Sequence, residues 1–142
     1  MDRITTSQQG WKNLVKKALS NYKALSIDER VWFNAESLVG AIRNGGLISY
    51  YYNSGADHLD DCIEALRTLH AHHALRLVLE VNAIFPGGVP KTVTGRNEVI
   101  NSWSDCGPEE RVIREHNRLE QMAANEIQMK IIAFCASRRL GI

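Results

Sequence analysis

Apolar side chains recur at helical spacing along most of the chain. Over residues 8–24 they follow an i, i+3, i+4, i+7 stripe, and most of the lysines lie off that stripe. Ser26 followed by Glu29 fits a capping box, in which each side chain binds a backbone amide that the first helical turn leaves unpaired. This second helix should stop at Gly45, because glycine takes the left-handed backbone conformation without steric cost. The pattern predicts two amphipathic helices, at 8–24 and 26–45.

The apolar and aromatic run at 47–52 is short enough to be either a buried strand or one to two turns of helix. We predict a short helix, because helical patterns flank the run on both sides and the sequence offers no partner strand. The next helix should begin at Ala56 or Asp57. Acidic residues in its first turn are favoured by the positive end of the helix dipole.

Three further helices are predicted in the second half of the chain. Residues 74–85 are apolar almost all round, which is typical of a central helix packed on several sides. A shorter helix should follow Thr94, and a final helical region should run over about 108–139 with a break near Asn125. Its expected inward positions are Val112, Leu119, Met122, Ala123, Ile127, Ile131 and Phe134. Because no segment alternates strictly between apolar and polar residues, we expect an all-α bundle of about six or seven helices.

Composition and charge exclude several classes of protein. The 142 residues are 44% hydrophobic and 23% charged, which is typical of one globular domain and predicts a single domain over 1–142. A net charge of +1 supplies no overall basic face for phosphates, so nucleic acid is a disfavoured partner. The charge is uneven along the chain: residues 1–25 sum to +4 and residues 26–64 sum to −5. These segments are either two solvated helix faces or complementary surfaces for a subunit or partner.

The sequence also bears on location and redox state. No run of eighteen apolar residues could span a membrane, and the first ten residues lack the apolar core of a signal peptide. We therefore expect a cytoplasmic protein that does not associate with membranes. The three cysteines, Cys62, Cys106 and Cys135, form no CxxC pair and are an odd number, which favours reduced thiols over disulfides or a zinc site.

Catalytic and metal-binding patterns are incomplete throughout the chain. His70, His72 and His73 lack an evident third ligand nearby, and only two of them share a helix face. Nothing in the sequence brings Cys106 together with His116 as a nucleophile and base. The glycine pairs match neither spacing of a phosphate-binding loop. We expect no bound metal, no cofactor and no enzymatic activity.

One segment combines unusual residues and is the candidate binding surface. It comprises Asn44, Gly45, Gly46, Tyr50, Tyr51, Tyr52 and Asn53. Three consecutive tyrosines cannot all point inward from a helix, so at least one phenol should lie near the surface, where tyrosine favours interfaces. The competing interpretation is structural: the glycines make a tight turn and the two asparagines cap helix ends.

The same segment carries a resemblance to a known family. The run Asn44-Gly45-Gly46 through Tyr50-Tyr51-Tyr52 to Asn53 resembles the signature of the DNA-mimic-protein-like family, a bacterial all-helical family of unknown function. The resemblance covers roughly residues 26–90 and implies an all-helical fold, with no activity or cofactor to transfer. A DNA mimic needs a phosphate-like array of carboxylates, which a net charge of +1 does not supply.

These observations favour a non-enzymatic module that binds and regulates another protein. A homodimer is also expected, since compact helical domains often bury an apolar helix face against a second copy. The alternative is a small-molecule or peptide-binding protein with a pocket near Tyr50–Tyr52, with or without enzymatic use. An exposed apolar patch would favour the first reading, and an enclosed cavity with perturbed titratable groups would favour the second.

Overall fold

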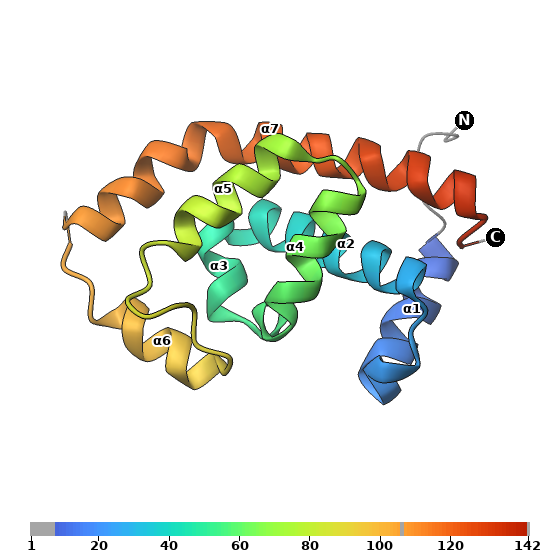
Figure 1. Ribbon diagram of the computed structural model, residues 1–142, viewed down its shortest axis with the longest axis horizontal. Coiled ribbons are helices and arrows are strands. Elements are labelled where there is room, and N and C mark those ends of the chain that lie inside the picture. The colour runs from blue at the N-terminus through green and yellow to red at the C-terminus, as the bar shows by residue number, and fades with distance from the viewer. Residues whose placement is uncertain (1–7, 106, 142) are drawn as a thin grey trace.

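The computed structural model describes residues 8–105 and 107–141, and every regular element in them is helical (Figure 1). This confirms the predicted all-α class. In chain order the elements are α1 (Gln8–Asn21), η1 (Tyr22–Ala24), α2 (Ile27–Gly45), α3 (Leu47–Tyr52), η2 (Ser54–His58), α4 (Leu59–Thr68), α5 (His72–Asn82), α6 (Val93–Asn101) and α7 (Pro108–Arg138), where η marks a 3-10 helix. None of the described helices is long and apolar enough to cross a membrane.

Helices α2 and α7 form the centre of the molecule, and the core lies where α4 and α5 pack against them. Figure 1 shows α7 running along one whole side, with α6 at one end and α1 projecting at the other. The buried face of α7 consists of Glu120, Ala123, Ala124, Ile127, Ile131, Phe134 and Cys135. The two alanines at its middle leave room for close packing of the neighbouring helices.

Local capping signals place several helix ends where the sequence predicts them. The Ser26 hydroxyl accepts the amide of Glu29 at 3.1 Å, while the Glu29 carboxylate accepts the amide of Ser26 at 2.8 Å. This confirms the capping box at the start of α2. Thr92 caps α6 by accepting the amide of Gly95, so α6 begins at Val93 and not after Thr94 as the sequence pattern predicts. The predicted short helix at 47–52 is also confirmed as α3.

Three sequence-based expectations are wrong in detail. Helix α7 continues through Asn125 without a break. Leu119 and Met122 are exposed instead of inward, because the packed face of α7 is the stripe through Ala123 and Ile127. Helix α5 is not surrounded: α4 and α7 cover it, and the Leu79 side chain remains exposed.

The start of α4 also differs from the expectation. The chain forms the 3-10 helix η2 at the predicted start, Ala56 or Asp57, and α4 begins only at Leu59. Ala56 is buried and the Asp57 carboxylate is bound by Arg96, so tertiary contacts hold this turn in its tighter form.

The first turns of helix α1 are anchored to the rest of the molecule. Near its start, Trp11 packs against Trp32 and Phe33 of α2, with ring centroids 5.9 and 6.0 Å apart. The backbone at Gly10 lies so close to Gly141 that a Cβ there would collide with it. The C-terminal end of the chain therefore packs against α1 and fixes its position (Figure 1).

Candidate binding site

The sequence-predicted binding segment is divided by the structure into buried and exposed parts. Tyr50 and Tyr51 are buried, whereas Tyr52 is 36% exposed, so one phenol does reach the surface. The Tyr51 hydroxyl donates to Asn82 Oδ1 at 2.5 Å, inside the core. Asn53 donates from Nδ2 to the carbonyl of Ser49 at 2.6 Å, which satisfies a carbonyl in the last turn of α3.

The two glycines before α3 serve a tight turn. Gly46 has φ +84°, a conformation that side chains disfavour, and a Cβ there would lie 3.1 Å from Glu120 Oε1. That same oxygen accepts the amide of Leu47 at 3.0 Å, so a buried carboxylate of α7 caps the start of α3. The expected turn at the glycines is therefore present, with an acidic partner that the sequence did not reveal.

Arg96 is a second buried charged residue that sequence reasoning missed. Its guanidinium is fully enclosed and donates to the carbonyls of Tyr51 (2.8 Å), Asn53 (3.0 Å) and Pro90 (3.1 Å). It also forms an ion pair with Asp57 at 2.6 Å. A buried arginine needs these partners because an unpaired charge in the core is strongly unfavourable. Arg96 thus ties α3, η2 and α6 together.

A groove of about 1120 Å³ opens between α1, α2, η2 and α7. It is called the groove from here on. Its floor is a stripe of α2 that includes Phe33, Ser37, Gly40 and Ala41. Of the predicted binding residues, Asn44, Tyr50 and Asn53 line the groove. Gly45, Gly46, Tyr51 and Tyr52 do not line it. The binding role of all seven stays a prediction.

Apolar and aromatic side chains dominate two walls of the groove. Helix α1 contributes Trp11 and Leu19, and α7 contributes Met129 and Ile132. Leu19 is 80% exposed and Met129 is 57% exposed, so both present apolar surface to solvent inside a concave region. Exposed apolar surface in a groove is typical of a site that another molecule covers.

A hydrogen-bonded cluster around Tyr22 fixes the inner end of the α1 wall. The Tyr22 hydroxyl donates to Asp61 Oδ2 at 2.6 Å and accepts from Asn34 Nδ2 at 2.8 Å. Its ring stacks on His58 with centroids 3.7 Å apart. Burial and the hydrogen bond to Asp61 raise the pKa of Tyr22 to about 12, so its phenol stays protonated at neutral pH. This contact joins η1 to η2 and α4.

The nucleophilic side chains of the core are inert. Burial raises the pKa of Cys62 and of Cys135 to about 12, and it raises the pKa of Tyr50 well above its usual value. These groups therefore stay neutral and poorly nucleophilic. Cys106 lies outside the described residues. Within the described ranges, the titratable groups show no arrangement of an activated nucleophile with a base.

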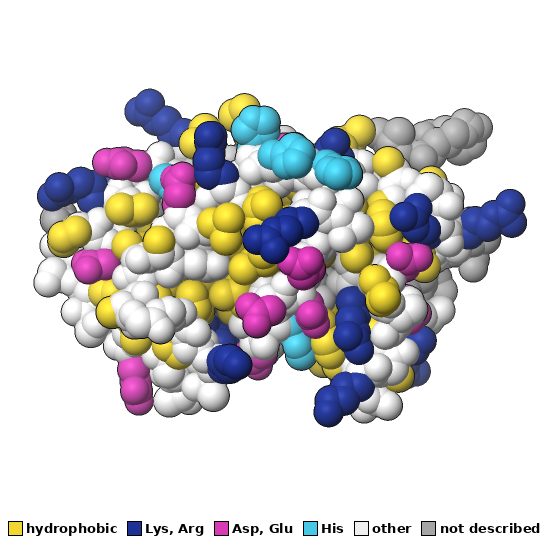
Figure 2. Space-filling model, in the orientation of Figure 1, with side chains coloured by type: hydrophobic (Ala, Val, Ile, Leu, Met, Phe, Trp, Pro, Cys, Tyr) yellow, Lys and Arg dark blue, Asp and Glu magenta, His cyan; other side chains and the backbone are white. Residues whose placement is uncertain are grey.

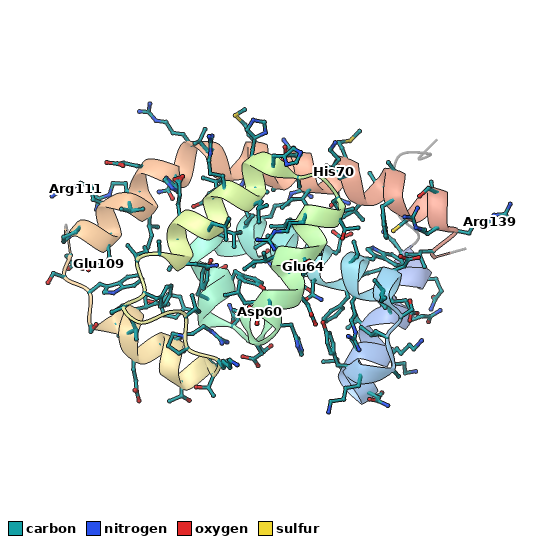
Figure 3. All side chains as sticks on the ribbon, viewed as in Figure 1. Asp60, Glu64, His70, Glu109, Arg111 and Arg139 are labelled. Atoms are coloured by element: carbon teal, nitrogen blue, oxygen red, sulfur yellow. The ribbon has the colours of Figure 1, made fainter. Side chains whose placement is uncertain are left out.

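Two of the five histidines form pairs with carboxylates. His73 Nδ1 lies 2.8 Å from Glu126 Oε2, and His116 Nε2 lies 2.7 Å from Glu80 Oε1, so two pairs link α5 to α7. His70 occupies the turn between α4 and α5 with φ +56° (Figure 3). Among the described residues, no group of three or more acidic, histidine or cysteine side chains could hold a metal ion.

Replacing Glu126 should make the free energy of unfolding less sensitive to a fall in pH below 4.5. Burial alone would raise its pKa, but hydrogen bonds from His73 and from the Ala74 amide lower it below the usual 4.5. A carboxylate whose pKa is lower in the folded protein than in the unfolded chain stabilises the fold above pH 4.5. This stabilisation is lost as the pH falls through the pKa of the folded protein. The difference in free energy of unfolding between wild type and Glu126→Gln should therefore shrink below pH 4.5. Urea titrations with Glu115→Gln as the exposed control would measure it, and a constant difference would contradict the assignment.

The acidic segment at 26–64 is largely neutralised within the chain. Four of its seven carboxylates form ion pairs: Asp28 with Arg138 (3.5 Å), Glu29 with Lys17 (2.9 Å), Asp57 with Arg96 (2.6 Å) and Glu64 with Arg67 (2.7 Å). The Lys17–Glu29 pair shows that the basic and acidic segments meet inside one chain. These described residues therefore do not present a phosphate-like array of free carboxylates.

Comparison with known proteins gives one match. A family described as DMP19-like protein matches residues 23–127. No curated protein and no solved structure matches the chain. The matched segment contains α2 to α6 and most of α7, whereas α1 and residues 128–141 lie outside it. Both apolar walls of the groove, with Trp11, Leu19, Met129 and Ile132, therefore come from outside the matched segment.

Proposed function

We propose that this chain, which belongs to the DMP19-like protein family, binds a segment of another protein in the groove and catalyses no reaction. The groove is open and larger than the ~300–1,000 Å³ typical of small-molecule pockets. Its walls present Leu19 and Met129 to solvent, and such side chains contribute binding energy when a partner covers them. A protein segment fits an open apolar groove of this size.

The observation that carries this proposal is Gly40, in the middle of the groove floor. A glycine inside a helix costs about 1 kcal/mol relative to alanine. Nothing described lies within 4 Å of the position where its Cβ would be, so no contact among the described residues requires a glycine there. A partner that approaches the α2 backbone closely would require one.

The small-molecule alternative has less support. It places a pocket around Tyr50–Tyr52, but Tyr51 is engaged with Asn82 in the core and Tyr52 lies outside the groove. Burial raises the pKa values of Tyr50 and Cys62, but the groove that Tyr50 lines is open and is not the enclosed cavity that this alternative requires.

Leu19→Asp should weaken partner binding, while Ile27→Asp should leave it unchanged. The two side chains are 80% and 81% exposed, but only Leu19 lines the groove. A carboxylate in an apolar contact loses its hydration on binding, so we expect at least a tenfold loss of affinity. The measurement is chemical cross-linking in host lysate followed by mass spectrometry of the partners of wild type and both variants. Equal recovery of partners by Leu19→Asp and wild type would contradict the proposal.

Gly40→Leu separates binding from folding. Leucine has a higher helix propensity than glycine, and its side chain would enter open space, so the free energy of unfolding should rise by up to about 1 kcal/mol. The same side chain would occupy the groove floor and block the partner. We expect the variant to be at least as stable as wild type in urea titrations and to recover no partner. A Gly40→Leu protein that binds normally would show that the groove floor is not the contact surface.

A further inference from the structure

The charged groups that line the groove determine which partner side chain it can hold. Four charged or histidine side chains line it: Glu36, Arg43, Asp57 and His58. The Asp57 carboxylate is already paired with the buried guanidinium of Arg96 at 2.6 Å. Arg43 is exposed and donates from Nη2 to Asn125 Oδ1 at 3.1 Å. Glu36 forms no ion pair with any other described residue, so its carboxylate is a negative charge of the lining that is still without a cation.

Glu36 lies on the floor of the groove close to aromatic residues. It is half-buried, and its stripe of α2 places Phe33 one helical turn before it and Gly40 one turn after it. The Phe33 ring stacks on Trp11 of α1 with centroids 6.0 Å apart, and both residues line the groove. Carboxylates and the faces of aromatic rings both attract positive charge. This part of the floor therefore suits a cation.

The ionised Glu36 carboxylate is unfavourable to the fold. Burial raises its pKa, and the side chains of Gln128 and Trp32 and the charge of Arg43 offset this only in part. A group whose pKa is raised in the folded protein stabilises the fold at low pH, and this stabilisation is lost as the pH rises through the raised pKa. At neutral pH the charged form of Glu36 is therefore disfavoured by the fold. Gly40, one turn further along the same stripe, is also less stable than an alanine would be.

We propose that the protein segment bound in the groove carries a basic side chain, lysine or arginine, that forms an ion pair with Glu36. This inference rests on the proposed function and names the chemistry of the partner. The basic group would give the Glu36 carboxylate the cation that the described residues do not supply. Its methylene groups would pack against the rings of Phe33 and Trp11, and the partner would approach the α2 backbone closely at Gly40.

The positive charges near the groove do not cancel this preference. Arg43 lies seven residues after Glu36 on α2, about 10 Å further along the helix, and it is exposed to solvent. The lysines of α1 do not line the groove, and Figure 2 shows basic side chains over α1 projecting into solvent. Water and salt screen exposed charges more than half-buried ones. The charge preference of the floor around Phe33 and Gly40 is therefore set by Glu36.

A displayed library of random 16-residue peptides, selected on the full-length protein, would test the inference. The peptides that occupy the groove are those that bind wild type and Ile27→Asp but lose binding to Leu19→Asp and Gly40→Leu. We expect each of them to contain a lysine or arginine on which binding depends. Replacing that residue by glutamine should weaken binding to wild type about tenfold or more, because it removes the charge that faces Glu36. This measurement needs no substitution at Glu36.

Glu36→Gln identifies the partner of that basic residue. It should weaken the selected peptides about tenfold or more. The control Glu98→Gln makes the same change in net charge at an exposed residue outside the groove, and it should leave their affinity unchanged. A peptide whose basic residue is replaced by glutamine should bind wild type and Glu36→Gln about equally, because the two changes remove one shared contact. Tryptophan fluorescence would measure these affinities, since Trp11 lines the groove.

Glu36→Gln should also be at least as stable as wild type in urea titrations at pH 7. It removes an ionised carboxylate whose charged form burial disfavours. Weaker peptide binding without a loss of stability would assign Glu36 to the binding surface, and a residue that serves only the fold would not give that result.

The remaining outcomes distinguish this inference from the function on which it rests. Peptides that require Leu19 and Gly40 but tolerate glutamine at every basic position would overturn the ion pair with Glu36 and leave the groove as the binding site. If no enriched peptide is sensitive to Leu19→Asp, both proposals fail. A wild-type dimer that Gly40→Leu converts to monomer would identify a second copy of the chain as the occupant and overturn the assignment to another protein.

Discussion

Arg96→Met should lower the free energy of unfolding by about 3 to 5 kcal/mol. The fully buried guanidinium donates to three backbone carbonyls and to Asp57, and methionine can replace its volume but none of its hydrogen bonds. The variant would leave the carbonyls of Tyr51 and Asn53 and the Asp57 carboxylate without their donor. Urea unfolding followed by far-UV circular dichroism would measure the change.

Arg67→Met is the control for this experiment. Arg67 also forms an ion pair, with Glu64 at 2.7 Å, but both side chains are exposed to solvent. An exposed pair of this kind contributes at most about 1 kcal/mol, so Arg67→Met should stay close to wild type. If the two variants lost equal stability, Arg96 would not be the link that joins α3, η2 and α6.

Ile127→Ala should lower the free energy of unfolding by about 2 to 5 kcal/mol, whereas Met122→Ala should change it by about 0.5 kcal/mol or less. Both residues lie on α7, and the sequence pattern places both on its inward face. In the structure Ile127 is fully buried and Met122 is 67% exposed. Truncating Ile127 leaves a cavity in the core, and truncating Met122 removes a side chain that is mostly in water.

Thermal and urea unfolding of these two variants would also test the position of α7. If the inward face were the one that the sequence pattern indicates, Met122→Ala would cost as much as Ile127→Ala. A large loss on Met122→Ala would therefore contradict the packing of α7 against α2 and α5. Leu119→Ala extends the comparison, since it is the second exposed residue that the pattern places inward.

The candidate site was only partly accessible from the sequence. The tyrosine excess pointed to the segment at 44–53, and three of its seven predicted residues, Asn44, Tyr50 and Asn53, line the groove. The turn and capping chemistry assigned to Gly46 and Asn53 is present as well. The groove walls could not be predicted, because Leu19 and Met129 look like ordinary positions of amphipathic helices. Gly40 was the available signal, as a mid-helix glycine without an evident local role.

The sequence by itself determined the helices and most of their ends, because helix formation depends on residues three or four apart and on caps within one turn. The capping box at Ser26 and Glu29 and the short α3 helix are local in this sense. Only the tertiary structure decided which face of α7 is buried and where the groove lies. It also decided the distant backbone partners of Arg96 and Glu120, the atoms of Tyr51, Asn53 and Leu47 that lie 43 to 73 residues away in the sequence. Such contacts follow from how whole helices pack, and no pattern within a few residues encodes them.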